Sequence, residues 1–97
     1  MFALALLADR AGLETVTAAI ELAPKNITVN AVLPGNIMTE GLEGNGPDYI
    51  AAMEASVPLK RLGTPEEIAS IVGWLVSDQA GFSTGANFAC NGGLYMT

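Results

Sequence analysis

The stretch that decides the fold class is Ile27-Thr28-Val29-Asn30-Ala31-Val32-Leu33-Pro34-Gly35. A short loop precedes it, most of its residues are apolar, several are β-branched, and Pro34-Gly35 ends it. A nearly continuous apolar run of this kind is typical of a strand that is covered on both faces of a parallel sheet. We therefore predict a parallel-sheet strand over residues 27–33 and an α/β fold.

Helical patterns lie on both sides of this strand. Residues 2–23 predict one helix, because apolar residues recur at helical spacings until Pro24 ends the run. These apolar residues are Leu6, Leu13, Val16 and Ile20. Residues 36–47 are rich in Gly and lack periodicity, which predicts a surface loop, and residues 48–57 can form a short helix.

The clearest helix start in the sequence is Thr64-Pro65-Glu66-Glu67. Thr64 can cap the helix, Pro65 suits the first helical position, and Glu67 completes a capping box. The apolar residues that follow lie on one stripe down to about Ser77, which predicts a core-facing helix. They are Ile68, Ile71, Val72, Leu75 and Val76.

A second strand is predicted over residues 87–90, where Asn91-Gly92-Gly93 stops it. The order of elements is then α–β–loop–α–α–β, and two strands joined by a long helical crossover run parallel. A chain of 97 residues forms one domain at most. We expect two parallel strands in it.

Composition excludes several classes of function. Four Lys and Arg stand against ten Asp and Glu, for a net charge of −6, and the absence of a basic stripe argues against nucleic acid as a partner. The longest apolar run is far shorter than the roughly 18 residues that cross a bilayer, so we expect no membrane segment. Asp9-Arg10 also argue against a signal peptide.

The chain has no His and a single cysteine, Cys90. Catalysis by Ser-His-Asp or Cys-His is therefore excluded, as are an intrachain disulfide and a metal site with two thiolates. We expect no metal, and a reducing cytoplasm as the compartment.

The candidate ligand site follows the first predicted strand. Loops at the carboxyl ends of parallel strands commonly hold the ligand, and the Pro34-Gly35 corner lets the backbone approach one closely. Asn36, Ile37 and Thr39 could then donate hydrogen bonds from amide or hydroxyl groups. The alternative is an ordinary turn, because Pro-Gly pairs end many strands that bind nothing.

Other polar residues favour structural interpretations. The acidic residues Glu40, Glu43 and Asp48 lack the spacing of a calcium loop and predict a solvated surface. Lys60-Arg61 could meet an anion, but pairs of this kind usually solvate a loop. Cys90 lies in an apolar context and predicts a small buried residue rather than a reactive thiol.

Three stretches together resemble the carboxyl-terminal part of short-chain dehydrogenase/reductases, from about residue 8 to residue 97. They are residues 27–39, residues 61–69 with the sequence Arg61-Leu62-Gly63-Thr64-Pro65-Glu66-Glu67-Ile68-Ala69, and Thr84-Gly85 with Asn91-Gly92-Gly93. The ending Asn91-Gly92-Gly93-Leu94-Tyr95-Met96 is most similar to the 3-oxoacyl-[acyl-carrier-protein] reductase branch.

The resemblance implies the carboxyl-terminal portion of a doubly wound, Rossmann-like parallel sheet that binds NAD or NADP. Residues 27–33 would be its sixth strand and residues 87–90 its seventh, and residues 1–97 would form a single partial domain. The loop after the cofactor stretch would close over the substrate. The implied cofactor-binding residues are Pro34, Gly35, Asn36, Ile37 and Thr39.

The resemblance also implies departures from the family pattern. The positions of the catalytic Tyr-x-x-x-Lys are Leu6 and Arg10 here, and neither can replace the lost groups, because leucine has no ionisable proton and arginine does not give one up. We thus assign no catalytic residue. The Gly-rich loop, the residue that selects NAD or NADP and the catalytic Ser would lie upstream, so we expect weak or no cofactor binding by this chain alone.

Three functions remain open at this point. The chain can be a carboxyl-terminal fragment of an NAD(P)-dependent oxidoreductase that works with a missing amino-terminal half. It can be an inactive assembly module that forms homo-oligomers, because the sixth strand has lost its neighbour and an open edge invites strand addition. It can also be a relic without function.

Overall fold

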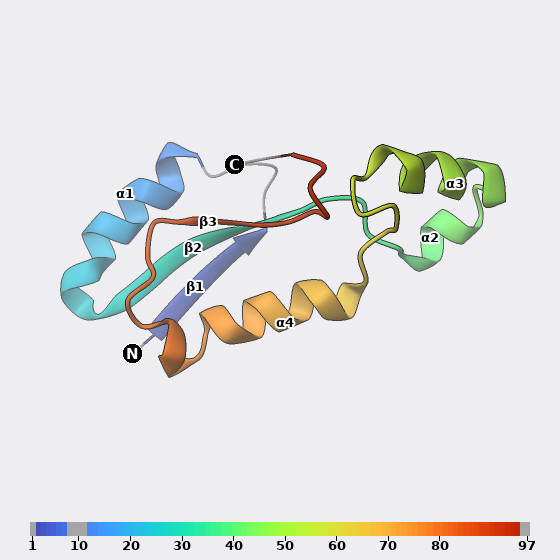
Figure 1. The fold of residues 1–97 in the computed structure, drawn as a ribbon. Helices are drawn as coiled ribbons and strands as arrows, with labels where there is room; N and C mark the ends of the chain where they lie inside the picture. The colour runs from blue at the N-terminus through green and yellow to red at the C-terminus, as the bar shows by residue number, and fades with distance from the viewer. Residues whose placement is uncertain (1, 8–11, 96–97) are drawn as a thin grey trace.

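The computed structural model describes residues 2–7 and 12–95. The chain folds into a parallel sheet with helices on both of its faces, and a helical arm extends beyond one end of the sheet (Figure 1). The strands are β1 (Phe2–Leu7), β2 (Ile27–Pro34) and β3 (Asn87–Cys90). The helices are α1 (Leu13–Leu22), α2 (Glu40–Glu43), α3 (Pro47–Ser56) and α4 (Pro65–Leu75), with short 3₁₀ turns at Ala23–Lys25 and Asp78–Ala80.

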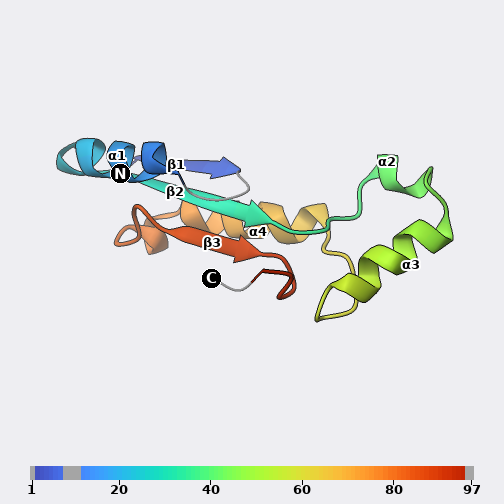
Figure 2. The same ribbon diagram turned by 90° about the horizontal axis from the view of Figure 1, so that it is seen from above.

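The sheet has the strand order β1-β2-β3, and both pairings are parallel. Phe2 pairs with Ile27 at one end of the β1–β2 ladder, and Pro34 pairs with Cys90 at the other end of β2. Strand β2 is the middle strand (Figure 2): β1 pairs with its residues 27–32 and β3 with its residues 31–34, so both neighbours flank it only at Ala31 and Val32. The two predicted strands and their parallel direction are confirmed.

The helix predicted over residues 2–23 is wrong at its amino-terminal end. Phe2–Leu7 is a strand, and the helix begins only at Leu13, whereas residues 8–11 lie outside the described part of the chain. A short apolar run fits a buried strand as well as a helix, and pairing with β2 satisfies its backbone. The order is therefore β–α–β–α–α–α–β with three strands, and the open edge predicted for β2 is wrong because β1 covers it.

The centre of the molecule is β2, whose residues Val29 to Val32 are at most 1% exposed. Asn30 is polar and fully buried, but its side chain is satisfied. Its Nδ2 donates to the main-chain oxygen of Ser83 over 2.9 Å, and its Oδ1 accepts from the N–H of Ala86 over 3.1 Å. These bonds tie the loop before β3 to the middle strand.

Helix α4 starts as predicted, with a complete capping box between Thr64 and Glu67. Its apolar stripe contributes Leu75 to a buried core that also contains Val32 and Ala80. Partly buried apolar side chains pack against this core. They are Ile68, Ile71, Val72 and Phe88. The prediction fails only at its last position, since Val76 is 53% exposed where the helix has ended.

Helix α1 covers the other face of the sheet with small residues. Thr15 and Ala19 are buried, which lets the helix approach β2 closely. Within α1, the three apolar residues whose spacing predicts a helix are instead exposed, with Leu13 at 79%, Val16 at 42% and Ile20 at 70%. Its apolar stripe therefore faces away from the core of this chain.

The arm comprises residues 38–62 and holds α2 and α3 beyond the sheet (Figure 2). The loop predicted over residues 36–47 contains the short helix α2, and α3 matches the predicted helix within a residue at each end. A parallel bridge closes the arm at its base, where Met38 N–H donates to the Gly63 oxygen over 2.9 Å. In the described ranges, no helix is long and apolar enough to span a bilayer.

Candidate functional site: a pocket at the carboxyl ends of two strands

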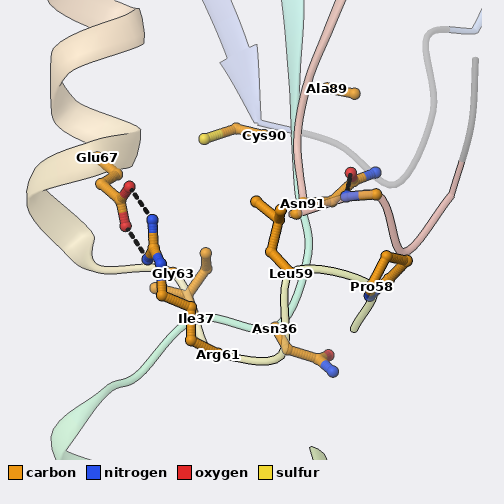
Figure 3. Close-up of a pocket in the computed structure, with 12 residues that line it drawn as sticks. Asn36, Ile37, Pro58, Leu59, Arg61, Gly63, Glu67, Ala89, Cys90 and Asn91 are labelled. Carbon is orange, nitrogen blue, oxygen red and sulfur yellow. Dashed lines mark hydrogen bonds and ion pairs between the residues drawn. The ribbon is translucent and has the colours of Figure 1, made fainter. Parts of the chain in front are cut away.

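An open pocket of about 480 Å³ lies where β2 and β3 end (Figure 3). Three segments form it: the corner after β2, the connection from α3 into α4, and the end of β3 with its turn. Its lining residues are Asn36, Ile37, Pro58, Leu59, Arg61, Gly63, Glu67, Ala89, Cys90, Asn91, Gly92 and Gly93. The parallel topology produces this convergence, because the carboxyl ends of neighbouring parallel strands meet at one edge of a sheet.

The corner after β2 is possible only with glycine at position 35. The Gly35 N–H donates to the Cys90 oxygen over 3.1 Å, so the two chain segments are in contact. A Cβ at this position would lie 2.6 Å from the Cβ and 2.8 Å from the Cα of Asn91. The absence of a side chain brings the two strand ends close enough to form one pocket wall.

The turn after β3 forms the facing wall. Asn91 holds it from both sides, since its Nδ2 donates to the Tyr95 oxygen and its Oδ1 accepts from the Gly93 N–H, each over 2.9 Å. Gly92 and Gly93 take φ values of +63° and +92°, which glycine adopts without strain. The Gly92 oxygen in turn accepts from the N–H of Leu59, which anchors the arm to the sheet.

The charged groups in the pocket are Arg61 and Glu67. Two parallel bonds of 2.8 Å join the guanidinium to the carboxylate (Figure 3, dashed lines). The Arg61 guanidinium, followed by the Thr64 N–H, lowers the pKa of Glu67 to about 2, and the same ion pair raises the pKa of Arg61. Both groups therefore stay ionised at neutral pH. Their side chains are partly exposed and form part of the pocket wall.

The predicted cofactor-binding residues differ in their position relative to the pocket. Asn36 and Ile37 line the pocket, whereas Pro34 and Gly35 shape the corner behind it. Thr39 does not line the pocket; it is exposed and lies at the N-cap of α2 without a side-chain bond. In the part of the chain that the structure describes, the Ile37 N–H donates to no protein acceptor.

Sequence reasoning missed the contributions of Leu59 and Asn91. From the sequence, Asn91 is the stop of a strand and part of a family motif and is assigned to no site, although the predicted parallel pairing places it at the same sheet edge as Pro34-Gly35. Cys90 was predicted to be buried, but it is half-buried and lines the pocket. The reason is that β3 is an edge strand with alternating exposure.

The acidic candidates are exposed as predicted, whereas Lys60 and Arg61 make specific contacts instead of only solvating a loop. Glu40, Glu43 and Asp48 are exposed on the arm, and the described residues include no cluster that could hold a metal ion. Lys60 donates from its Nζ to the Ala55 oxygen over 2.7 Å and so ends α3. The charge of Arg61 is balanced by its pairing with Glu67.

Comparison with known proteins identifies the class. The pattern of the family described as Enoyl-(Acyl carrier protein) reductase matches residues 5–95, which is nearly the whole chain. The chain belongs to the short-chain dehydrogenase/reductase family of oxidoreductases.

The relatives include proteins named as reductases of acetoacetyl-CoA and of 3-oxoacyl-[acyl-carrier-protein]. The chain is 51% identical over 89 residues to acetoacetyl-CoA reductase of Cupriavidus necator. This match covers 90% of the present chain and 36% of the relative. It is 46% identical over 92 residues to 3-oxoacyl-[acyl-carrier-protein] reductase FabG of Pseudomonas aeruginosa, covering 93% of this chain and 37% of the relative. Nodulation protein G of Azospirillum brasilense is 46% identical over 80 residues, 82% of this chain and 32% of that protein. The chain thus spans about a third of the length of these relatives.

Proposed function

We propose that this chain forms the carboxyl-terminal, cofactor-facing part of an NAD(P)-dependent oxidoreductase with a doubly wound sheet. Its reaction is hydride transfer between the nicotinamide and a carbonyl carbon, with 3-oxoacyl thioesters as the substrate class. The observation that carries the proposal is the pocket at the carboxyl ends of β2 and β3, to which Asn36 and Ile37 contribute. The names of the relatives supply the substrate class.

The residues of this chain bind and position rather than catalyse. The Ile37 N–H and the Asn36 side-chain amide, which also donates to the Ser56 Oγ over 3.4 Å, would hold polar groups of the cofactor, and Gly35 would let it approach the backbone. Leu59 supplies an apolar wall that displaces water. When bound, the nicotinamide supplies the hydride. The proton for the carbonyl oxygen has to come from another segment, because position 6 is a leucine within β1.

Cofactor binding by the chain alone is expected to be weak. The pyrophosphate of a dinucleotide is normally held by a loop with the pattern G-x-G-x-x-G at a helix amino terminus, and this pattern does not occur among these 97 residues. The phosphate contacts therefore belong to another polypeptide segment. A reducing cytoplasm remains the proposed compartment, in keeping with the single free cysteine.

The test is complementation. The chain is mixed with an amino-terminal fragment of acetoacetyl-CoA reductase from Cupriavidus necator that carries the Gly-rich loop and the catalytic residues, and NADPH oxidation is followed with acetoacetyl-CoA. We expect oxidation only when both polypeptides are present. A matched mixture with Gly35→Val, in which the corner cannot form, should stay inactive. A flat absorbance trace with the wild-type chain, over 3-oxoacyl substrates of several lengths and with both NADH and NADPH, contradicts the proposal.

A second candidate function is that of a self-associating assembly module. The observation that favours it is the exposed apolar stripe of α1, on which Leu13, Val16 and Ile20 face away from the core. Contiguous exposed apolar surface on a small protein marks an interface. Formation of a homo-oligomer through this stripe is compatible with the first function. The assembly module would be favoured over the oxidoreductase only if no amino-terminal fragment restored NADPH oxidation.

A further inference from the structure

The chain contains two Asn-Gly pairs, Asn45-Gly46 and Asn91-Gly92. Asparagine is chemically labile, and it loses its side-chain amide most readily when glycine follows, because glycine has no Cβ to keep its main-chain nitrogen away from the neighbouring side chain. Since glycine follows the asparagine in both pairs, their intrinsic reactivities are similar. The fold, however, places the two asparagines in different surroundings.

Asn45 is exposed in the turn that joins α2 to α3, at the outer end of the arm (Figure 2). Within residues 2–7 and 12–95, its side chain forms no hydrogen bond, and nothing but its chain neighbours lies within 4 Å of the point where a Cβ of Gly46 would be. The Gly46 N–H donates to the Glu43 oxygen over 3.4 Å, which is a long and weak bond. The side-chain amide of Asn45 and the main-chain nitrogen of Gly46 therefore have room to approach each other.

Asn91 is instead fixed at the pocket wall (Figure 3). Its Oδ1 accepts from the Gly93 N–H and its Nδ2 donates to the Tyr95 oxygen, each over 2.9 Å. Its main-chain oxygen accepts from the Leu94 N–H over 3.1 Å. Both substituents of the side-chain carbon are thus held, and the amide that would leave is a donor in one of these bonds. Loss of this amide requires a local opening of the turn first.

We propose that Asn45 is a site of spontaneous deamidation in the folded chain, and that the hydrogen bonds of the pocket turn protect Asn91 from the same reaction. Hydroxide takes the N–H proton of Gly46, and the nitrogen attacks Cγ of Asn45 to form a new C–N bond. The Cγ–Nδ2 bond breaks, and the amide takes a proton from water and leaves as ammonia. Water then opens the resulting succinimide ring at either carbonyl, which gives aspartate or isoaspartate.

The modification changes the charge of the arm and does not depend on the proposed function. It adds one carboxylate to a segment on which Glu40, Glu43 and Asp48 are already exposed. The new carboxylate lies just before Gly46, the N-cap of α3, where a negative charge is compatible with the helix dipole. Isoaspartate also inserts a methylene group into the main chain of this turn. Because the turn lies beyond the sheet, we expect both products to leave the sheet intact.

The first experiment compares the two sites within one sample of the wild-type chain. The folded chain is incubated at mildly alkaline pH and digested with trypsin, whose cleavage after Lys25 and Arg61 places Asn45 and Asn91 in separate peptides. Mass spectrometry with fragmentation follows the conversion of each amide to an acid over time. We expect Asn45 to react at least about tenfold faster than Asn91, which reacts only when the turn opens. Equal rates, or a faster reaction at Asn91, would overturn the proposal.

Two controls separate the effect of the fold from that of the sequence. In the chain unfolded by guanidinium chloride, both asparagines should react at similar rates. A difference that stayed as large in denaturant would arise from the sequence rather than from the hydrogen bonds, and would disprove the protection. Asn45→Gln should abolish the acid product in its peptide, because glutamine would have to form a larger ring. Persistence of that product would place the reaction at another residue and contradict the proposal.

Aspartate variants test what each modification does to the fold. Asn45→Asp should unfold at the same urea concentration as the wild type, since the side chain of Asn45 holds no described contact. Asn91→Asp should unfold at a lower concentration, because a carboxylate cannot donate to the Tyr95 oxygen. Wild-type stability of Asn91→Asp would show that this bond does not hold the turn, and would count against its protective role.

Discussion

At the residue scale, a few side chains determine the shape of the pocket. Gly35 allows β2 and the turn after β3 to touch, and Asn91 holds that turn through two hydrogen bonds. Arg61 and Glu67 add an ion pair to the wall and link the loop before α4 to the helix itself. The Asn91 bonds lie within one turn, whereas the Gly35 contact joins segments distant along the chain and the ion pair joins a loop to a helix. Each contact has a consequence for folding that can be measured.

The ion pair predicts an acid-dependent loss of stability. The pKa of Glu67 is about 2 in the folded chain, below its ordinary value of 4.5, mainly because of the Arg61 guanidinium. A lowered folded-state pKa stabilises the folded state above the unfolded-state pKa, and this contribution disappears as the pH falls from about 4.5 through about 2. Glu67→Gln should therefore be less stable than wild type at pH 7 and should flatten the decline over this range.

Urea unfolding at pH 7, 4 and 2.5 checks this expectation. Glu66→Gln is the matched control, because its carboxylate is exposed on the same helical turn and only its main-chain oxygen accepts a bond, from Ser70. If the Glu67→Gln and Glu66→Gln chains lost stability in parallel with the wild type on acidification, the ion pair would have no role in the pH dependence.

Gly35→Ala should destabilise the fold by about 1–3 kcal/mol, the usual cost of overpacking a close contact. The added Cβ would meet the Cα and Cβ of Asn91, and main-chain atoms cannot move aside without breaking the bond between Gly35 and Cys90. Gly73→Ala is the control, since this helical glycine has open space around it and alanine favours a helix by up to about 1 kcal/mol. Urea midpoints that shift in the same direction for both variants would contradict the close approach.

At the element scale, local signals were sufficient where they were complete. The capping box at Thr64 and the stop at Asn91-Gly92-Gly93 predicted the start of α4 and the end of β3 correctly. The apolar run of β2 predicted its strand for the same reason. The run Phe2–Leu7 has no capping residue, no Pro and no alternation of apolar with polar residues. It therefore contains no local signal that distinguishes a strand from a helix.

The capping box predicts that Thr64→Ala destabilises the chain by about 1 kcal/mol. The Thr64 Oγ1 accepts the N–H of Glu67 over 3.1 Å, and the alanine variant leaves this donor at the helix start without its partner. Thr39→Ala provides the comparison, because Thr39 occupies the N-cap of α2 without a side-chain bond. Urea unfolding should distinguish the two, and equal stabilities would show that the box contributes nothing.

At the scale of the whole molecule, the two sides of the chain differ in how much apolar surface remains uncovered. Helix α4 buries its stripe in the core with Val32, whereas α1 is attached through Thr15 and Ala19 and exposes its stripe. Among the described residues, β1 is also an edge strand whose outer side is unpaired. This chain spans about a third of its relatives' length. Its uncovered apolar surface is then the place where the rest of such a fold, or another copy of the chain, would attach.

The exposed stripe predicts concentration-dependent association of the chain. Ile20→Glu should weaken it more than about tenfold, since burial of such a side chain contributes about 2 kcal/mol. Thr17→Glu adds the same charge at an exposed polar position of the same helix and should leave association nearly unchanged. Light scattering over a range of concentrations measures the difference, and a wild-type chain that stays monomeric throughout would contradict the prediction.

The sequence by itself determined the elements whose signals are local: β2, α3, α4 and β3. It also determined the parallel direction that places Asn36 and Ile37 at the carboxyl-end edge of the sheet, where the pocket lies. Only the tertiary structure decided the fate of Phe2–Leu7, the outward orientation of the α1 stripe and the pairing of Arg61 with Glu67. The physical reason is that caps and turns form within a few residues of chain. Strand pairing, helix orientation and ion pairs depend on which surfaces are near one another after folding, and periodicity alone carries no information about such neighbours.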